Sequence, residues 1–301
     1  MSYFKRCLCL PMLLFVLVYA SACAPNSNPA STTTPNPTSV AVESNTLPTD
    51  EAGLPLVAKV NDTGITLADY ELAVHRLQSQ PFANPENLPK IVLQTMIQQV
   101  LIDQAAAKNN IVVTPGEVDT EIQELITNSG GADGWKKWLG DNGYTEDELR
   151  ATMHDTLLTS RMRDRVTGDL TTAVPQVHAR HILVATEDEA NQLLVRLRNG
   201  EDFAGLAKQY SLDKSSSDDG GDLGWFAQEE LTEPGLAAVA FQLKVGQIAG
   251  PVKTSVGYDI LQTLETDNKV IDPVKRAQIA QVRFENWLNA LSASAKIESY
   301  L

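Results

Sequence analysis

The chain has 301 residues, a hydrophobic fraction of 43% and a formal net charge of −14 at pH 7. This length is enough for two domains, and the hydrophobic fraction is enough for a sizeable core. The acidic balance argues against nucleic acid as a partner, because phosphate binding needs clustered Lys and Arg, and it favours neutral or basic partners.

Residues 1–22 have the pattern of a secretory leader. Two basic residues precede an apolar stretch over residues 10–19, which is too short to span a membrane. Residues 20–23 are Ala-Ser-Ala-Cys, which resembles a bacterial lipobox, although its first Ala stands where Leu is usual. The resemblance implies that Cys23 becomes the acylated first residue of the mature chain. The alternative is ordinary signal-peptide cleavage, in which Cys23 has no role.

Residues 23–53 are rich in Pro, Asn, Ser and Thr and lack a hydrophobic period, so they predict a flexible linker. Cys7 and Cys9 lie in the leader, which leaves Cys23 as the one cysteine of the mature chain. A disulfide or a cysteine metal site within the mature chain is therefore excluded. A cysteine followed by a spacer is the arrangement that a membrane-tethered domain needs.

Residues 54–172 predict a domain that is almost entirely helical. A short strand over residues 56–60 comes first, followed by a turn. Helix starts with a capping Thr and an acidic residue three positions later are found at Thr66, Thr114 and Thr145. Hydrophobic residues then recur at helical spacing. We expect most of these side chains to form the core of the domain.

Residues 57–61 are followed by one predicted helix and then by a longer helix around residues 97–102. This pattern resembles the N-terminal chaperone region of SurA- and PrsA-type extracytoplasmic folding factors. Near the end of the chain, Asp272 and Pro273 begin an amphipathic helix within residues 269–301. The resemblance implies that this helix packs on the N-terminal helices, which makes the middle domain an insertion. The alternative partner of the helix is a second subunit.

Residues 173–268 predict a domain with the element order β-α-α-β-α-β-β. Four segments of this domain together resemble the parvulin family of peptidyl-prolyl cis–trans isomerases, in order and in approximate spacing. These segments are residues 177–184, 210–213, 220–226 and 250–261. The resemblance implies an α+β fold, in which a parvulin-like domain with a four-stranded antiparallel sheet is inserted into a helical chaperone domain.

A prolyl isomerase needs little conventional chemistry. Rotation about an X–Pro bond has a barrier of roughly 18–20 kcal/mol, and the twisted state loses the amide resonance. A dry pocket that holds the proline ring, together with a few polar groups that orient the amide, lowers this barrier. The expected reaction requires no cofactor, metal ion or nucleophile.

The resemblance also assigns site residues. Four hydrophobic residues match the family's proline pocket, and they are Leu223, Leu231, Leu236 and Phe241. The alternative is that these side chains are ordinary core. His181 matches the family's first histidine, Asp213 a position near the amide, and Thr254 a hydroxyl position near the paired histidines.

Asp259 stands where most active relatives have a second histidine. A carboxylate there can accept a hydrogen bond from His181 and favour its charged form. We therefore expect isomerase activity that is present but weaker than in a two-histidine relative. His178 lies three residues before His181 on the same predicted strand, so the two side chains should point to opposite faces, and no metal site is expected.

The residues and resemblances together predict an extracytoplasmic foldase of the bacterial cell envelope, held to the membrane by a lipid at Cys23. Its expected partners are unfolded or newly exported proteins with X-Pro bonds. One alternative is a binding protein that keeps the parvulin fold without catalysis, and another is a structural surface lipoprotein. The sequence leaves open whether the protein is a monomer or a homodimer.

Overall fold

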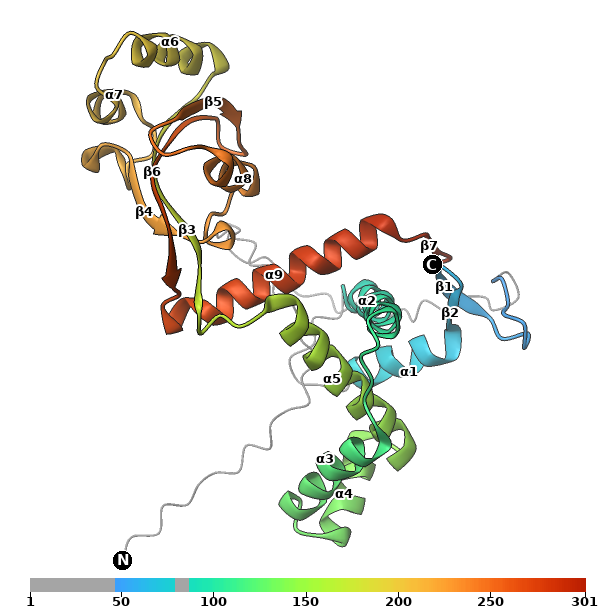
Figure 1. The fold of residues 1–301 in the computed structure, drawn as a ribbon. Coiled ribbons are helices and arrows are strands. Elements are labelled where there is room, and N and C mark those ends of the chain that lie inside the picture. Colours follow the sequence, from blue (N-terminus) through green and yellow to red (C-terminus); the bar gives the residue numbers. More distant parts are fainter. Residues whose placement is uncertain (1–46, 79–86) are drawn as a thin grey trace, which may run out of the picture. The chain divides into compact units, whose positions relative to one another are not determined.

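The computed structural model describes residues 47–78 and 87–301 (Figure 1). The predicted leader, Cys23 and the linker up to residue 46 lie outside the described residues. The chain divides into two compact units, of which the first runs to Leu158 and takes in Ala295–Leu301, and the second is Thr159–Ser294. The second unit therefore contains the final helix in addition to most of the predicted middle domain. Within the described ranges, no helix is both long enough and apolar enough to cross a membrane.

The first unit contains a three-stranded antiparallel sheet with the order β2-β1-β7. Its strands are β1 (Leu56–Val60), β2 (Thr63–Thr66) and β7 (Ile297–Ser299). β1 is the strand predicted over residues 56–60. The sequence does not predict β2 or β7, because neither is long enough for a clear alternation of apolar and polar residues. The pairing of β7 with β1 brings the end of the chain to the first unit.

The helices that follow β2 are α1 (Leu67–Gln78), α2 (Leu88–Lys108), α3 (Pro115–Asn128), α4 (Ala132–Asn142) and α5 (Glu146–Thr167). Helices start directly after Thr66, Thr114 and Thr145, as predicted. The side chain of Thr66 accepts a hydrogen bond from the backbone N–H of Asp69, at 3.1 Å. The backbone N–H groups of Thr114 and Thr145 each donate to a glutamate three residues later, at 2.8 Å. These contacts satisfy backbone groups that a helix start leaves unpaired.

The second unit contains a four-stranded antiparallel sheet with the order β4-β3-β6-β5. Its strands are β3 (Ala173–Val184), β4 (Asp222–Phe226), β5 (Ile248–Lys253) and β6 (Tyr258–Val270). The helices of this unit are α6 (Glu187–Arg198), α7 (Phe203–Tyr210), α8 (Pro234–Gln242) and α9 (Pro273–Ser294), with short 3₁₀ turns η2 (Ser217–Asp219) and η3 (Gln228–Glu230). The predicted element order and the α+β fold class are confirmed.

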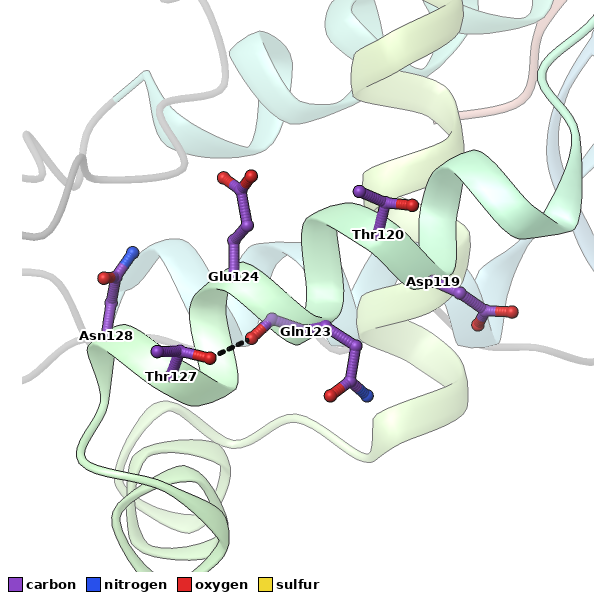
Figure 2. A pocket seen from close by; sticks show the side chains of 6 residues that line it. All are labelled: Asp119, Thr120, Gln123, Glu124, Thr127 and Asn128. Atoms are coloured by element: carbon purple, nitrogen blue, oxygen red, sulfur yellow. Dashed lines mark hydrogen bonds between the residues drawn. The ribbon is translucent and has the colours of Figure 1, made fainter.

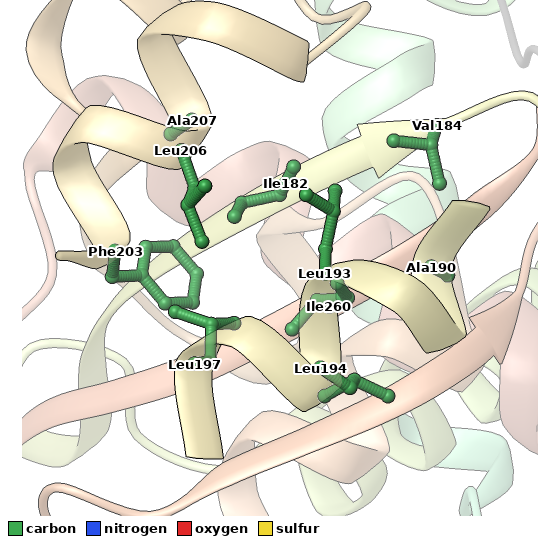
Figure 3. Packing of buried hydrophobic residues seen from close by; sticks show 10 residues of the cluster. All are labelled: Ile182, Val184, Ala190, Leu193, Leu194, Leu197, Phe203, Leu206, Ala207 and Ile260. Atoms are coloured by element: carbon green, nitrogen blue, oxygen red, sulfur yellow. The ribbon is translucent and has the colours of Figure 1, made fainter. Parts of the chain in front are cut away.

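Two hydrophobic clusters lie on the two faces of this sheet. The first joins α6 and α7 to the sheet (Figure 3), and its members are Ile182, Val184, Ala190, Leu193, Leu194, Leu197, Phe203, Leu206, Ala207 and Ile260. The second joins α8 to the sheet, and its buried members are Val177, Ala179, Phe226, Leu236, Ala240 and Leu261. Ile260 and Leu261 are consecutive on β6 and belong to different clusters, as the alternation of side chains along a strand requires. We call these surfaces the α6–α7 face and the α8 face.

The final helix α9 starts as predicted, with Asp272 accepting a hydrogen bond from the backbone N–H of Val274 at 2.9 Å. A third buried cluster joins α9 to the base of the sheet, and its members are Leu170, Val174, Ala227, Ile271 and Ile279. The packing of this helix on the N-terminal helices stays a prediction.

Candidate functional site

The site is built on the α8 face, from the part of β3 that carries His181. Val177 and Ala179 precede His181 at intervals of two residues and belong to the α8 cluster. Leu261, the residue that pairs with His181 across β3 and β6, belongs to the same cluster. His181 therefore extends the row of apolar side chains on this face as a polar, buried residue.

His181 lies between two carboxylates. Its Nδ1 is 2.7 Å from Oδ1 of Asp259, and its Nε2 is 2.8 Å from Oδ2 of Asp213. Nε2 also lies 3.1 Å from the hydroxyl oxygen of Ser216. A protonated imidazole can donate from both ring nitrogens, so this arrangement fits the imidazolium form. The prediction that a carboxylate at position 259 accepts a hydrogen bond from His181 agrees with these distances.

The protonation states of His181 and Asp213 follow from the groups that surround them. Burial lowers the pKa of His181, but the hydrogen bonds and charges of Asp259 and Asp213 outweigh burial and raise the pKa above the ordinary value. Burial raises the pKa of Asp213, but hydrogen bonds from Ser215, Ser216 and His181 outweigh it and hold that pKa far below the ordinary value. Asp213 is therefore ionised at neutral pH.

A tight turn holds Asp213 in place. The backbone N–H and the hydroxyl of Ser215 donate to Oδ1 of Asp213, at 3.0 and 2.6 Å, and the hydroxyl of Ser216 donates to Oδ2, at 2.6 Å. Sequence reasoning assigned Asp213 but missed Ser216, which contacts both Asp213 and His181. The spacing Asp-x-Ser-Ser, typical of turns in which an aspartate bonds to the backbone two residues later, is the signal that could have found it.

Gly221 allows the backbone to approach His181 closely. The backbone N–H of His181 donates to the carbonyl of Gly221 at 2.8 Å. Gly221 has a φ of +83°, and a Cβ at this position would lie 2.1 Å from the carbonyl oxygen of His181. A side chain there would force the two segments apart, so this glycine is required for the geometry of the site.

Thr254 completes the polar part of the site from the turn between β5 and β6. Its hydroxyl lies 3.2 Å from Oδ2 of Asp259, the carboxylate oxygen that His181 does not use. The structure thus connects all four residues predicted for the polar site, in the order Asp213, His181, Asp259 and Thr254. Side-chain exposure falls along this connection, from 22% for Asp213 to 3% for Asp259.

The four hydrophobic residues predicted for the proline pocket lie in the α8 cluster. Leu236 is buried, whereas Leu223, Leu231 and Phe241 are partly buried and pack against the buried members. The ring of Phe241 meets that of Phe226 edge to face, with the ring centroids 6.2 Å apart. Leu236 therefore has the burial of a core residue, and the other three leave part of their surface open to solvent.

Other polar groups lie away from this connection. His178 pairs with Asp222, at 2.8 Å from Nε2, and shares no partner with His181. Among residues 47–78 and 87–301, no group of three or more His, Cys, Asp and Glu is arranged to hold a metal ion. A hollow in the first unit follows one face of α3 (Figure 2), and its lining residues are Asp119, Thr120, Gln123, Glu124, Thr127 and Asn128. None of the predicted site residues lines it.

Two families match this chain over separate segments. Residues 172–265 match the PPIC-type PPIase (rotamase) domain, and residues 39–163 match the SurA-like N-terminal domain. The first match contains every predicted polar and pocket residue, and the second contains the helical region predicted to resemble folding factors of the SurA type.

Individual relatives are similar over both segments. The chain is 33% identical over 247 residues to foldase protein PrsA of Caldanaerobacter subterraneus subsp. tengcongensis, which covers 73% of this chain and 76% of that protein. It is 32% identical over 215 residues to foldase protein PrsA of a Geobacillus species, with coverage of 66% and 76%. A crystal structure of peptidylprolyl isomerase PrsA from Bacillus anthracis has 28% identity, coverage of 67% and 94%, and a TM-score of 0.41.

Proposed function

This chain belongs to the PrsA family of foldases and carries a PPIC-type peptidyl-prolyl isomerase domain, and we propose that it isomerises X-Pro bonds in newly exported proteins through the site on the α8 face. The main support for this site is the position of three apolar side chains. Leu223, Leu231 and Phe241 are partly buried and pack against one apolar cluster, on the face of the sheet that also bears His181. A proline ring needs such an apolar surface, and the adjacent amide needs polar groups within reach.

The apolar part of the site binds the proline ring. Leu223, Leu231 and Phe241 remove the ring from water, while buried Leu236 supports them from below. Burial of the ring fixes one side of the X–Pro bond, so that the preceding residue can rotate against it. Because the twisted amide is less polar than the planar one, partial desolvation of the bond favours the twisted state.

The polar part of the site acts on the amide through Asp213. This carboxylate is the most exposed member of the connection from Asp213 to Asp259, whereas His181 and Asp259 are buried behind it. The planar amide carries more negative charge on its oxygen than the twisted amide does. An ionised carboxylate near that oxygen therefore raises the energy of the planar state more than that of the twisted state, which lowers the barrier. His181 is a positioning residue in this mechanism.

Asp259 reduces the activity relative to a two-histidine site. With carboxylates on both sides, His181 stays charged and attracts Asp213, which weakens the field of Asp213 at the substrate. We expect Asp259→His to raise kcat/KM by about three- to tenfold, because a neutral partner removes one reason for His181 to stay charged. An unchanged or lower kcat/KM would refute this explanation of the substitution.

A lipid on Cys23 is the proposed means of attachment to the membrane. The support is the sequence of residues 20–23 and the linker-like composition of the residues that follow. Labelling cells with a radioactive fatty acid should mark the wild-type protein and leave Cys23→Ala unlabelled. Equal labelling of the two proteins, or none in either, would remove the proposal.

The isomerase activity itself is tested on purified residues 24–301 with a tetrapeptide that contains one X-Pro bond. The expected result is exchange between cis and trans that is faster than the uncatalysed reaction, which takes tens of seconds. Exchange at the uncatalysed rate, with unfolded clients still protected from aggregation, would instead support a binding protein that has lost catalysis.

A further inference from the structure

Leu231 of the proposed pocket lies in a short segment between β4 and α8, residues 227–233, which we call the η3 segment. It contains the 3₁₀ turn η3, and Leu231 follows this turn directly. The turn is closed by Glu230, whose Oε2 accepts a hydrogen bond from the backbone N–H of Ala227 at 2.8 Å. A turn this short has few internal contacts, so its position depends on what holds it from outside.

Two basic residues of α9 hold the η3 segment. Nε of Arg283 lies 2.6 Å from Oε1 of Glu229, and Nζ of Lys275 lies 2.6 Å from Oε1 of Glu230. The first pair is largely withdrawn from solvent, with side-chain exposures of 25% for Arg283 and 16% for Glu229, whereas Lys275 is 52% exposed. Screening by water is weaker for the withdrawn pair, so Arg283 contributes more than Lys275.

Arg283 is itself fixed by a second contact. Its Nη1 donates to the carbonyl of Thr167 at 2.8 Å, at the end of α5. Below the ion pairs, Ala227 of the η3 segment is buried in one cluster with Ile279 of α9. Apolar packing thus sets the distance between α9 and the segment, and the charges set its orientation.

The far end of the η3 segment reaches the polar part of the site. Glu233 accepts hydrogen bonds from the hydroxyl and the backbone N–H of Ser255, the latter at 3.3 Å. Ser255 follows Thr254, whose hydroxyl lies beside Asp259. The segment that carries Leu231 is therefore fixed by α9 at one end and by the turn bearing Thr254 at the other.

Loss of Arg283 would leave the carboxylate of Glu229 without its ion-pair partner. Oε2 of Glu229 is buried and, among the described residues, has no hydrogen-bond partner. Without the guanidinium, the carboxylate would have to move outward to regain water, because an unpaired charge in a withdrawn position is costly. The backbone of the η3 segment would move with it, and so would Leu231.

We propose that Arg283 and, to a smaller extent, Lys275 are positioning residues of the isomerase site, which hold Leu231 in the proline pocket by binding Glu229 and Glu230. The proposal rests on the proposed function, since it takes the proline ring to contact Leu231. It assigns the final helix a role in substrate binding, although that helix lies outside the segment that matches the isomerase domain.

The test compares Arg283→Ala, Arg283→Lys and Glu229→Gln with wild type in the full-length protein, using a proline peptide to measure KM and kcat separately. We expect Arg283→Ala to raise KM about fivefold with kcat within about twofold, because a displaced Leu231 weakens binding of the ring. Arg283→Lys keeps the charge and should recover most of the affinity. Glu229→Gln removes the carboxylate charge that Arg283 neutralises, so it should raise KM less than Arg283→Ala does.

Two controls separate the possible outcomes. Arg196→Ala removes a more exposed ion pair, between Arg196 of α6 and Glu201, which follows that helix, and should leave KM unchanged. Hydrogen exchange should accelerate at the backbone amides of residues 228–233 in Arg283→Ala and stay unchanged in α6. If Phe241→Ala raises KM but Arg283→Ala does not, the positioning role is wrong while the pocket stands. If neither variant changes KM, the pocket is misplaced and both proposals fall.

Discussion

Both faces of the sheet in the second unit carry a cluster of apolar side chains, and the two clusters are covered by different elements. On the α6–α7 face, two helices and the sheet bury ten apolar residues, among them Ile182 and Ile260 (Figure 3), and Ile248 and Tyr258 pack against them partly buried. On the α8 face, which also bears His181, six apolar residues that pack against the buried cluster stay partly buried, and Leu223, Leu231 and Phe241 are among them. Apolar residues on a sheet therefore form a core or a binding site according to the elements that cover them.

The largest effects are expected at a matched pair of phenylalanines, one on each face of the sheet. Phe203→Ala on the α6–α7 face should lower the free energy of unfolding by about 3–5 kcal/mol, because it opens a cavity in a closed core. Phe241→Ala on the α8 face should lower kcat/KM by about 30-fold, since about 2 kcal/mol of contact with the proline ring is lost.

Chemical denaturation and a peptide assay on both variants check this pair. Phe203→Ala, measured under conditions where it is folded, should keep a kcat/KM close to that of wild type. A variant of Phe203 that loses activity while it is folded, or a variant of Phe241 that loses only stability, would show that the faces have been assigned the wrong way round.

The charged group beside the α8 face allows a second comparison between neighbouring aspartates. Asp213→Asn should lower kcat/KM about tenfold, because the amide carries no charge to destabilise the planar substrate. Asp218→Asn makes the same change in charge at an exposed residue in the same loop, and it should have no effect. Equal losses in the two variants would mean that only the net charge of the loop matters.

The sequence predicts the elements of this site better than it predicts their surroundings. The helix caps, the order of the strands and the placement of Asp213, His181, Thr254 and Asp259 follow from local patterns and from resemblance. Ser216 is missed because its hydrogen bonds depend on how the loop before η2 folds back over β3. The contact of Arg283 with Glu229 is missed for a similar reason, since it joins residues 54 positions apart whose spacing follows no period.

The sequence also does not show which leucines belong to the core and which line the pocket. Leu236 and Leu231 are both leucines that match pocket positions, yet Leu236 is buried and Leu231 is partly open. Exposure depends on which element covers a side chain, and that is decided by tertiary packing. The pattern of residue types therefore identified the cluster. It could not show which of its residues line the pocket and which are buried beneath it.

The buried imidazole makes stability on the α8 face depend on pH. The raised pKa of His181 means that its contribution is complete below the ordinary value of about 6.5 and is lost as the pH rises through the folded value. The lowered pKa of Asp213 means that its contribution is present above about 3.9 and is lost as the pH falls. The stability that His181 and Asp213 contribute together is therefore greatest between about pH 3.9 and about pH 6.5.

Thermal unfolding of wild type and His181→Gln between pH 5 and pH 9 measures this effect. The difference in Tm between the two proteins should be largest near pH 5 to 6 and should shrink as the pH rises, because only the wild type loses a bound proton. A difference that stays constant over the whole range would mean that His181 does not carry the extra proton.

The smallest effect is expected at the start of α6, on the closed side. Thr186 caps this helix, accepting a hydrogen bond from the backbone N–H of Glu189 at 3.3 Å. Thr186→Ala should cost about 1 kcal/mol of stability and leave kcat/KM unchanged. Denaturant unfolding and the peptide assay check both parts, and a loss of activity would imply that α6 also contributes to the site.

The most direct measurement is an NMR titration of the protein, with labelled leucine methyl groups, by a peptide that contains one X-Pro bond. If the α8 face takes up the proline ring, the signals of Leu223 and Leu231 should shift in proportion to binding, while those of Leu193 and Leu206 on the α6–α7 face stay in place. Shifts confined to Leu193 and Leu206, or signals from both faces that remain fixed while isomerisation is catalysed, would contradict the account.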